Sequence, residues 1–358
     1  MVKRRGFARI GLVGVVAALV MAACGGGAPA ATTAPTASAA ASVVATATPP
    51  PVVVKLKAAS FGSISDAPFF IAQDKGYFKD EYLDVEFVPS QNAAQGITFL
   101  ASGQVEVAGL APTPGLFNAI ADGIKVKIVA DKGQIDARHS YVALVIRKQL
   151  YDAGTIKTVK DLKGKKVGVS GLETGTGAEL HYTLQEAGLT INDITVVPGS
   201  PPDGYNGLKN GALDAAALQE PFLAQALADG SGQLVRVFGE VMPHGQNGIV
   251  AFGERMLNDK PLAARFMRAY LRGVAAFNAA FPDDKANAKG REEIVQILIK
   301  YTTVKNPALY DQVRMPLFPA DASIDTKSID KFQQFFIDQK LQKKFVPVSD
   351  YYQKIETK

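Results

Sequence analysis

The stretch GVSGLETGTGAELHYTLQEAGL, residues 168–189, combines the end of a strand, a glycine-rich turn and an amphipathic helix. Such a turn presents backbone N–H groups at a helix N-terminus, where a small ligand can bind. Thr174 and Thr176 are both candidates for the N-cap of this helix. The stretch therefore predicts an α/β fold with a ligand site beyond the carboxyl end of a strand.

Strand-like and helix-like segments alternate through the first two-thirds of the chain. This alternation predicts parallel sheets covered by crossover helices. Strands are expected at 53–60, 83–88, 105–110, 125–130, 141–147, 166–170, 194–197, 215–218 and 234–238. Helices are expected between them at 67–79, 93–102, 114–122, 175–187, 205–210 and 221–228.

The last third of the chain changes character. Apolar residues recur three and four positions apart at 262–281, 291–302 and 328–341, which predicts three helices. We expect these helices to pack back onto the first domain. The folded part, roughly 300 residues, exceeds what one hydrophobic core usually organises, so two domains are predicted.

The first 23 residues have the pattern of a signal peptide. A basic start at Lys3, Arg4 and Arg5 precedes an apolar run that is shorter than the ~20 residues of a membrane-spanning helix. The arginine pair also resembles a twin-arginine signal, so Sec and Tat export both stay open. Cys24, the only cysteine, follows two alanines and precedes three glycines, which resembles a bacterial lipobox. The alternative is a cleaved signal followed by an incidental cysteine.

Residues 24–54 contain no charged and no aromatic residue. Such a composition predicts a disordered tether. With a lipidated Cys24, the protein would be exported and held at the extracytoplasmic face of a cell membrane. Four of the 39 Lys and Arg lie in the signal, so the mature chain has 35 basic and 34 acidic residues. This near neutrality gives no reason to expect nucleic acid as a partner.

Four loops that follow predicted strands are expected to meet at one cleft. They are SFGSISDAPFF (60–70), GLAPTPG (109–115), the turn of the opening stretch, and LQEPF (218–222). The candidate ligand-binding residues are Phe61, Ser63, Ser65, Asp66, Pro112, Thr113, Gln134, Glu173, Thr174, Gly175, Thr176, Tyr205 and Glu220.

Three blocks of the chain resemble one family of solute-binding proteins. DAPFFIAQDKGYFKDEYLDVEFVPSQNAAQGITFLASGQVEVAGLAPTP (66–114) is similar to the opening of the nitrate/sulfonate/taurine and thiamine-pyrimidine group. TVKDLKGKKVGVSGLETGTG (158–177) and YNGLKNGALDAAALQEPFLAQALADGSGQL (205–234) resemble two later blocks of that family, in the same order.

The resemblance implies a type II periplasmic-binding-protein fold, whose two lobes close around one solute. Lobe I would comprise 55–140 and 248–358, and lobe II 141–247, with crossovers near 139–147 and 240–251. The implied function is the solute-binding component of an ABC importer. Its partners would be a small-molecule ligand and a membrane permease with its ATPase subunit, and the protein is expected to be a monomer.

The sequence shows no recognisable catalytic set. The pyrimidine synthases that resemble this family carry a cysteine-rich iron motif, whereas no cysteine follows Cys24. His139, His181 and His244 lack the spacing of a metal-binding helix, although His139 stands near Gln134 at a predicted crossover. We expect no enzymatic activity, no cofactor and no metal. The alternative is an exported enzyme or a sensor that uses the same fold.

The nature of the solute is the finer question. A helix N-terminus with Thr174 and Thr176 suits an anion, but Glu173 and Glu220 would repel one. The four loops contain no arginine. Their aromatic residues can stack on a planar ring. These aromatic residues are Phe61, Phe69, Phe70, Tyr205 and Phe222. The helical spacing of Phe69 and Phe70, however, favours core packing for these two residues.

The balance of these features favours a neutral heteroaromatic solute, either riboflavin or a thiamine-type pyrimidine. The alternative solute is an aliphatic sulfonate, taurine or nitrate.

Overall fold

The computed structural model describes residues 52–282 and 290–357. The predicted signal peptide, Cys24 and nearly all of the predicted tether lie outside the described residues. Within these two ranges, no helix combines the length and the apolar composition that crossing a membrane requires.

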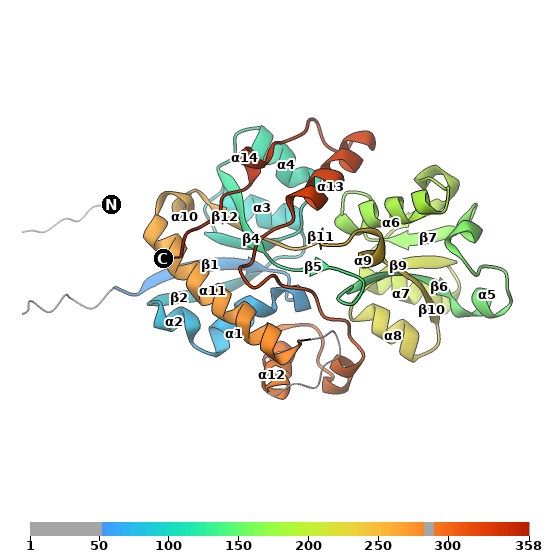
Figure 1. Cartoon of the computed structure of the whole chain (residues 1–358), viewed down its shortest axis with the longest axis horizontal. Helices are drawn as coiled ribbons and strands as arrows, with labels where there is room; N and C mark the ends of the chain where they lie inside the picture. The colour runs from blue at the N-terminus through green and yellow to red at the C-terminus, as the bar shows by residue number, and fades with distance from the viewer. Residues whose placement is uncertain (1–51, 283–289, 358) are drawn as a thin grey trace, which may run out of the picture. The chain divides into compact units, whose positions relative to one another are not determined.

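Two five-stranded sheets organise the chain into two lobes (Figure 1). The first sheet has the order β2-β1-β3-β12-β4, and the second has the order β10-β6-β9-β7-β8. The predicted α/β class with two lobes is therefore confirmed. The strands of the first sheet are β1 (Val54–Ser60), β2 (Leu83–Pro89), β3 (Val107–Leu110), β4 (Val126–Asp131) and β12 (Ile249–Gly253). Those of the second are β6 (Val142–Arg147), β7 (Lys166–Val169), β8 (Thr195–Pro198), β9 (Ala215–Gln219) and β10 (Gly232–Val237).

Both sheets are mixed, so the prediction of parallel sheets holds for only part of each sheet. Strand β12 runs antiparallel to β3 and β4, and β6 runs antiparallel to β9 and β10. Each of these two strands is the first that the chain forms after it enters a lobe from the other one. Such a strand runs away from the opposite lobe, whereas the strands of the βα units run toward it.

The two lobes are joined by two short strands that pair with each other. Strands β5 (Gln134–Ile135) and β11 (Gly245–Gln246) form an antiparallel ribbon at the centre of Figure 1. The chain therefore passes between the sheets at 132–141 and at 238–248. The crossovers predicted near 139–147 and 240–251 also included β6 and most of β12. The sequence does not show where the connecting segment ends and the first strand of the next lobe begins.

Helices cover both sheets close to their predicted positions. The helix expected at 67–79 is divided into α1 (Ala67–Asp74) and α2 (Tyr77–Asp80), because Gly76 between them has a φ of 76°, outside the right-handed helical region. The other helices of the two lobes are α3 (Ala93–Ala101), α4 (Pro114–Ala121), α5 (Lys148–Asp152), α6 (Gly175–Glu186), α7 (Pro201–Asn210), α8 (Phe222–Ala228), α9 (Phe238–Val241) and α10 (Glu254–Asn258).

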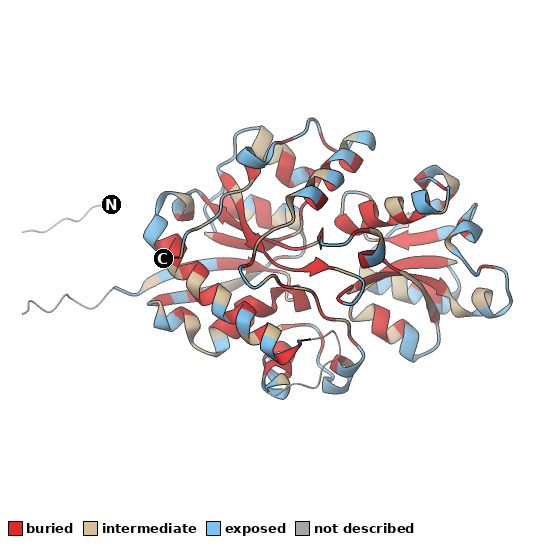
Figure 2. Ribbon diagram, in the orientation of Figure 1, coloured by how far each residue is buried: buried red, intermediate tan, exposed pale blue. Residues whose placement is uncertain are grey.

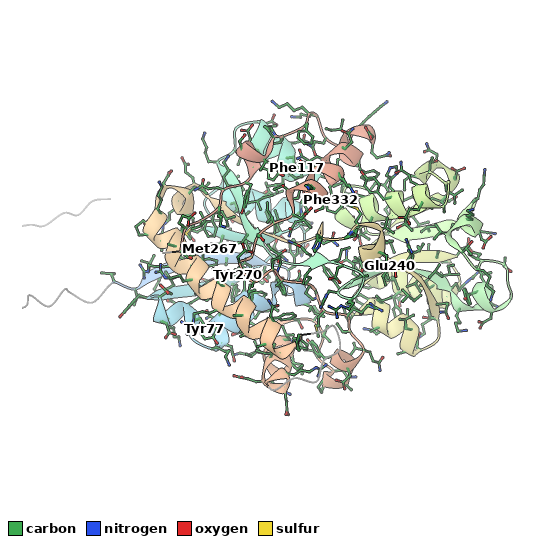
Figure 3. All side chains as sticks on the ribbon, in the orientation of Figure 1. Tyr77, Phe117, Glu240, Met267, Tyr270 and Phe332 are labelled. Carbon is green, nitrogen blue, oxygen red and sulfur yellow. The ribbon has the colours of Figure 1, made fainter. Side chains whose placement is uncertain are left out.

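The C-terminal helices contact both lobes. Helices α11 (Lys260–Ala280) and α12 (Arg291–Tyr301) pack on α1, as expected. Helix α13 (Thr326–Asp338), which carries Phe332 in Figure 3, instead contacts β11 and α6. The Tyr182 hydroxyl of α6 donates a 3.0 Å hydrogen bond to the carbonyl of Lys331. Helix α13 therefore contacts both the second lobe and the connection between the lobes. Helix α14 (Val348–Tyr351), which follows it, packs on β4 of the first lobe.

The core of the first lobe is rich in aromatic rings. Phe69 and Phe70 of α1 are buried, and the Phe69 ring lies 5.1 Å from that of Tyr270 on α11. The packing interpretation of these two phenylalanines is thereby confirmed. The strands at the centre of both lobes are mostly buried in Figure 2, which leaves the ends of the strands to form surfaces.

Helix α11 approaches α1 closely because it has a glycine at the contact. A Cβ atom added at Gly273 would lie 2.2 Å from the carbonyl oxygen of Pro68. We expect Gly273→Ala to lower the free energy of unfolding by about 1–3 kcal/mol, since the two helices must separate. Urea unfolding followed by circular dichroism measures this loss. Ala275→Leu on the exposed side of α11 is the matched control, and equal midpoints for both variants would contradict the steric explanation.

Candidate functional site

A cleft with a volume of about 760 Å³ lies between the carboxyl ends of strands from both sheets. One wall includes Phe61 after β1, Leu110 at the end of β3 and Lys132 after β4. The other includes Ser170 after β7 and Gln219 at the end of β9. The observed site thus follows the rule that ligands bind where strands of α/β sheets end.

The structure brings most of the predicted ligand-binding residues together. Both lobes contribute to this set, so a bound molecule would touch both of them. The predicted residues that line the cleft are Phe61, Ser63, Ser65, Thr113, Glu173, Thr174, Gly175, Thr176 and Glu220.

Four predicted residues lie elsewhere. Pro112 and Asp66 are buried behind the wall. Gln134 is buried in the connection, where its Nε2 donates to Gln246 Oε1 at 3.1 Å. Tyr205 lies on α7, and its hydroxyl donates to Asp229 at 2.8 Å. These residues were predicted because they lie in or near the loops that follow strands. The sequence does not show whether a side chain in such a loop points into the cleft or away from it.

The cleft also contains polar residues that the sequence interpretation missed. Lys132 and Ser170 each directly follow a strand, so the rule used for the other loops would have found them. Asn247 lies in the second crossover, which was expected near 240–251, but nothing in the sequence indicated that its side chain lines the cleft. The polar lining residues outside the prediction are Gln91, Asn92, Lys132, Tyr141, Ser170, Ser200, Gln219 and Asn247.

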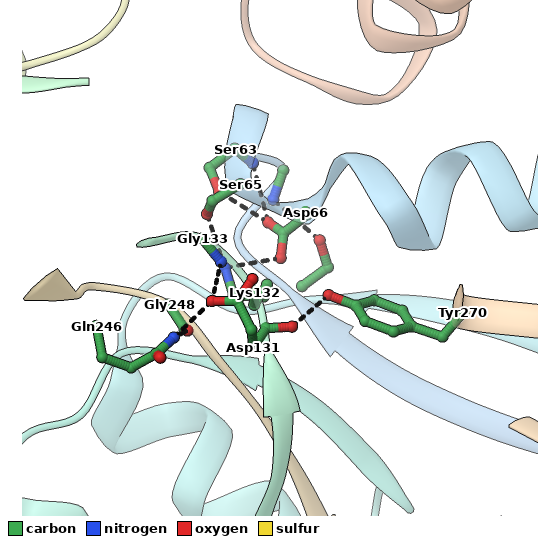
Figure 4. A network of polar contacts seen from close by, with 11 residues as sticks. Ser63, Ser65, Asp66, Asp131, Lys132, Gly133, Gln246, Gly248 and Tyr270 are labelled. Atoms are coloured by element: carbon green, nitrogen blue, oxygen red, sulfur yellow. Dashed lines mark hydrogen bonds and ion pairs between the residues drawn. The ribbon is translucent and has the colours of Figure 1, made fainter. Parts of the chain in front are cut away.

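A buried ion pair forms the floor of the cleft on the side of the first lobe (Figure 4). Lys132 Nζ lies 3.0 Å from Asp66 Oδ1 and donates to Ser65 Oγ at 2.9 Å. Asp66 Oδ2 accepts hydrogen bonds from the backbone N–H and the hydroxyl of Ser63, at 3.0 and 2.9 Å. The ammonium also lies 5.2 Å from the centre of the Phe61 ring. The pair therefore positions three cleft residues and adds no net charge.

A second buried carboxyl group supports the connection beneath this floor. Asp131 Oδ1 accepts hydrogen bonds from the backbone N–H of Gly133 at 2.9 Å and from Gln246 Nε2 at 2.6 Å. The Tyr270 hydroxyl donates to the Asp131 carbonyl at 2.6 Å. Burial raises the pKa of Asp131 to about 8. The two crossover segments and α11 are therefore joined at one residue.

The N-terminus of α6 forms part of the opposite wall. Thr174 is the N-cap, and its hydroxyl oxygen accepts from the backbone N–H of Gly177 at 3.1 Å. The Thr176 hydroxyl accepts a 2.9 Å hydrogen bond from Gln219 Nε2. The first-turn N–H groups of a helix lack helical partners, so they are available to a ligand.

Glu220 lines the cleft and also holds two chain segments. Its Oε2 accepts from the backbone N–H of Ala224 in α8 at 3.0 Å. Its Oε1 accepts from the backbone N–H of Arg314 at 2.9 Å. Arg314 lies between Val313 and Met315, which belong to the core of the first lobe. Glu220 thus joins the lobes, so a role in ligand binding would be combined with a structural one.

A third buried carboxyl group, that of Glu179, lies in α6. Glu179 Oε1 accepts a 2.8 Å hydrogen bond from Asn247 Nδ2, and Oε2 has no hydrogen-bond partner among the described residues. Burial raises the pKa of Glu179 from its ordinary 4.5 to about 8. At neutral pH the group is therefore largely an uncharged acid, held beside a residue of the cleft wall.

His139 and His181 are engaged in local or packing contacts. His139 Nδ1 lies 3.0 Å from Asp136 Oδ1, and the His181 ring lies 4.8 Å from that of Phe335. Across 52–282 and 290–357, no group of three His, Cys, Asp or Glu residues is arranged to hold a metal ion.

The chain matches one family model over residues 64–284, described as NMT1/THI5 like. A Haemophilus influenzae protein named for thiamine biosynthesis is 31% identical over 133 residues, which cover 37% of this chain and 38% of that relative. A Bacillus subtilis protein named as binding aliphatic sulfonates is 25% identical over 277 residues, covering 74% of this chain and 80% of the relative. A Saccharomyces cerevisiae pyrimidine phosphate synthase is 29% identical over 144 residues, or 40% and 36% of the two chains.

The fold is also similar to a solved structure. The periplasmic aliphatic sulphonate binding protein SsuA of Escherichia coli superposes with a TM-score of 0.67 at 17% identity. The superposition covers 84% of this chain and 92% of that protein. The two proteins therefore share the periplasmic-binding-protein architecture.

The buried ion pair makes a prediction about stability. Lys132→Met leaves the Asp66 carboxylate buried without its partner, and we expect the free energy of unfolding to fall by about 3–5 kcal/mol. Adding Asp66→Asn to this variant removes the unpaired charge and should restore much of the loss. Urea unfolding measures both effects. Lys343→Met, which breaks the exposed pair with Asp122, is the control, and equal stability of the two lysine variants would refute the assignment.

Glu179 makes a prediction about pH. The unfolded chain loses the Glu179 proton near pH 4.5, whereas the folded chain keeps it to about pH 8. The free energy of unfolding therefore falls as pH rises between these values, by up to about 1.4 kcal/mol per pH unit. Relative to the wild type, Glu179→Gln should gain about 1–3 kcal/mol between pH 5 and pH 7.

Denaturant unfolding at both pH values tests this expectation. Gln185→Ala, an exposed substitution on the same helix that removes no titratable group, should follow the wild-type pH profile. If the Glu179→Gln profile also runs parallel to the wild type, the carboxyl group is not held in its acid form.

Proposed function

The chain belongs to the NMT1/THI5-like family, and on that premise we propose that it is the solute-binding component of an ABC importer. The observation that carries this proposal is the cleft, because both lobes contribute polar side chains to it. A ligand that contacts both lobes favours the arrangement in which they lie together. The shared architecture with a periplasmic binding protein supports the same function.

The proposed setting follows from the N-terminal sequence. A lipidated Cys24 would hold the protein on the extracytoplasmic face of a membrane, and residues 24–54 would act as the tether. The protein would work there as a monomer, delivering its solute to a permease driven by an ATPase subunit.

The charge of the cleft supports an uncharged solute. The ammonium of Lys132 is matched by Asp66, whereas the carboxylate of Glu173 also lines the cleft. An anion between these groups would be repelled unless its other contacts outweighed that cost.

The size and lining of the cleft support a heteroaromatic solute. A volume of about 760 Å³ falls within the range typical of sites for vitamin-sized ligands. The rings of Phe61 and Tyr141 can contact a planar ligand, although Phe69, Phe70, Tyr205 and Phe222 do not line the cleft. The amides of Gln91, Asn92, Gln219 and Asn247 can pair with ring nitrogens and carbonyls. We therefore propose riboflavin or a thiamine-type pyrimidine.

An aliphatic sulfonate, taurine or nitrate is the second candidate. It is favoured by the α6 N-terminus, where Gly175 and Thr176 line the cleft, and by the similarity to the Bacillus subtilis protein that is named as binding aliphatic sulfonates. The yeast relative is a synthase, so the proposal of binding without turnover needs its own test. Mass spectrometry of the ligand after prolonged incubation with the protein should recover it unchanged.

Titration separates the two candidates. We expect riboflavin fluorescence to be quenched on binding, or calorimetry to detect a thiamine-type pyrimidine, while taurine, ethanesulfonate and nitrate give no heat of binding. Glu173→Gln should change the affinity for the neutral ligand by less than about threefold, because a neutral ligand carries no net charge for the carboxylate to attract or repel. For a sulfonate, the same change would raise affinity about three- to tenfold by removing a repulsive charge.

Glu240→Gln, outside the cleft on α9 (Figure 3), is the matched control for the charge change. Tight sulfonate binding that strengthens in Glu173→Gln, without a response to flavin or pyrimidine, would reverse the order of the two candidates.

A further inference from the structure

A second cavity of about 280 Å³ opens beside the main cleft, in the second lobe. Ser170, Ser200 and Pro201 line both cavities, so the two spaces adjoin at the carboxyl ends of β7 and β8. We call the second space the side cavity. It is bounded by α7 on one side and by residues of β7, β8 and β9 on the other.

Three glycines of α7 and β7 lie in the wall of the side cavity. Gly204 and Gly207 of α7 and Gly168 of β7 all line it. A Cβ atom at Gly207 would lie 2.5 Å from Leu213 Cδ1, and one at Gly168 would lie 2.6 Å from the same atom. Leu213 thus fills part of the space that the glycines leave. The lining also includes the exposed residues Ser200, Asp203 and Asn206, so the side cavity is open to solvent and accessible to a ligand.

The lining of the side cavity mixes apolar walls with unused polar groups. Val169, Val197 and Leu213 supply carbon surface. The Ser170 hydroxyl and the Asn206 amide take part in none of the hydrogen bonds between described residues. A carbon chain that carries hydroxyl groups matches both features, because its C–H surface contacts the walls and its hydroxyls pair with the free groups.

We propose that the protein binds a two-part ligand, with a planar head in the main cleft and a flexible polyhydroxylated chain in the side cavity. This inference rests on the proposed function and narrows its ligand class, since a thiamine-type pyrimidine and a short sulfonate both lack such a chain. Among the proposed solutes, riboflavin has both parts.

A pair of flavins tests the inference with the full-length protein. Riboflavin carries the hydroxylated chain, whereas lumiflavin has the same ring system with a methyl group in its place. Asn206→Trp puts a large side chain at an exposed position on the rim of the side cavity. We expect it to weaken riboflavin binding at least tenfold and lumiflavin binding less than twofold, as measured by fluorescence titration.

Two further variants keep the test decisive. Ala212→Trp narrows the cavity from another exposed position and should reproduce the effect if Asn206→Trp does not fold. Lys209→Trp, on α7 outside the lining, should bind both flavins as the wild type does. Equal loss of both flavins, or no loss of riboflavin in either rim variant, would overturn the two-part ligand and leave the solute-binding function standing. Failure of the wild type to bind either flavin would overturn both the inference and the proposed neutral flavin ligand.

Discussion

The ion pair between Lys132 and Asp66 is the interaction on which the cleft of the first lobe depends. It joins the loop after β1 to the first residue of the crossover, and both side chains are almost fully buried. Removing either side chain would leave the other charge buried without a partner, which lowers the free energy of unfolding. The loss of hydration of each charge is compensated by its attraction to the other. The same two groups hold Ser63 and Ser65 by hydrogen bonds. The arrangement of the cleft floor is therefore coupled to the folding of the lobe itself.

The charge balance of the site follows from this pairing. If only the charges of the residues that line the cleft are added, Lys132 contributes a cation. Asp66, which lies behind the wall, compensates that charge. The carboxylate of Glu173 lines the opposite wall. The proposal of an uncharged solute, first suggested by the sequence of the loops, is supported by this pairing of Lys132 with Asp66.

The elements of this fold were largely predictable, because strands and helices have local signatures. Each of the nine strands expected from alternation corresponds to an observed strand, and the carboxyl-end rule located nine of the thirteen predicted site residues at the cleft. The directions of β6 and β12 could not be predicted, since they depend on where the chain changes lobe. Asn247 was missed for the same reason, and Tyr205 was misplaced because the face that a helix presents is decided by its packing partners.

Ligand binding is coupled to the relative position of the two lobes, because residues that line the cleft also hold the lobes and their connection together. Glu220 of the second lobe accepts a hydrogen bond from the backbone of Arg314 in the first. Asn247 of the second crossover donates to Glu179 of the second lobe. Both Glu220 and Asn247 line the cleft, so a ligand that hydrogen-bonds to either side chain acts on a contact that also holds the lobes. Its affinity then includes the free energy of keeping or replacing those contacts, which links the chemistry of the solute to the relative position of the two lobes.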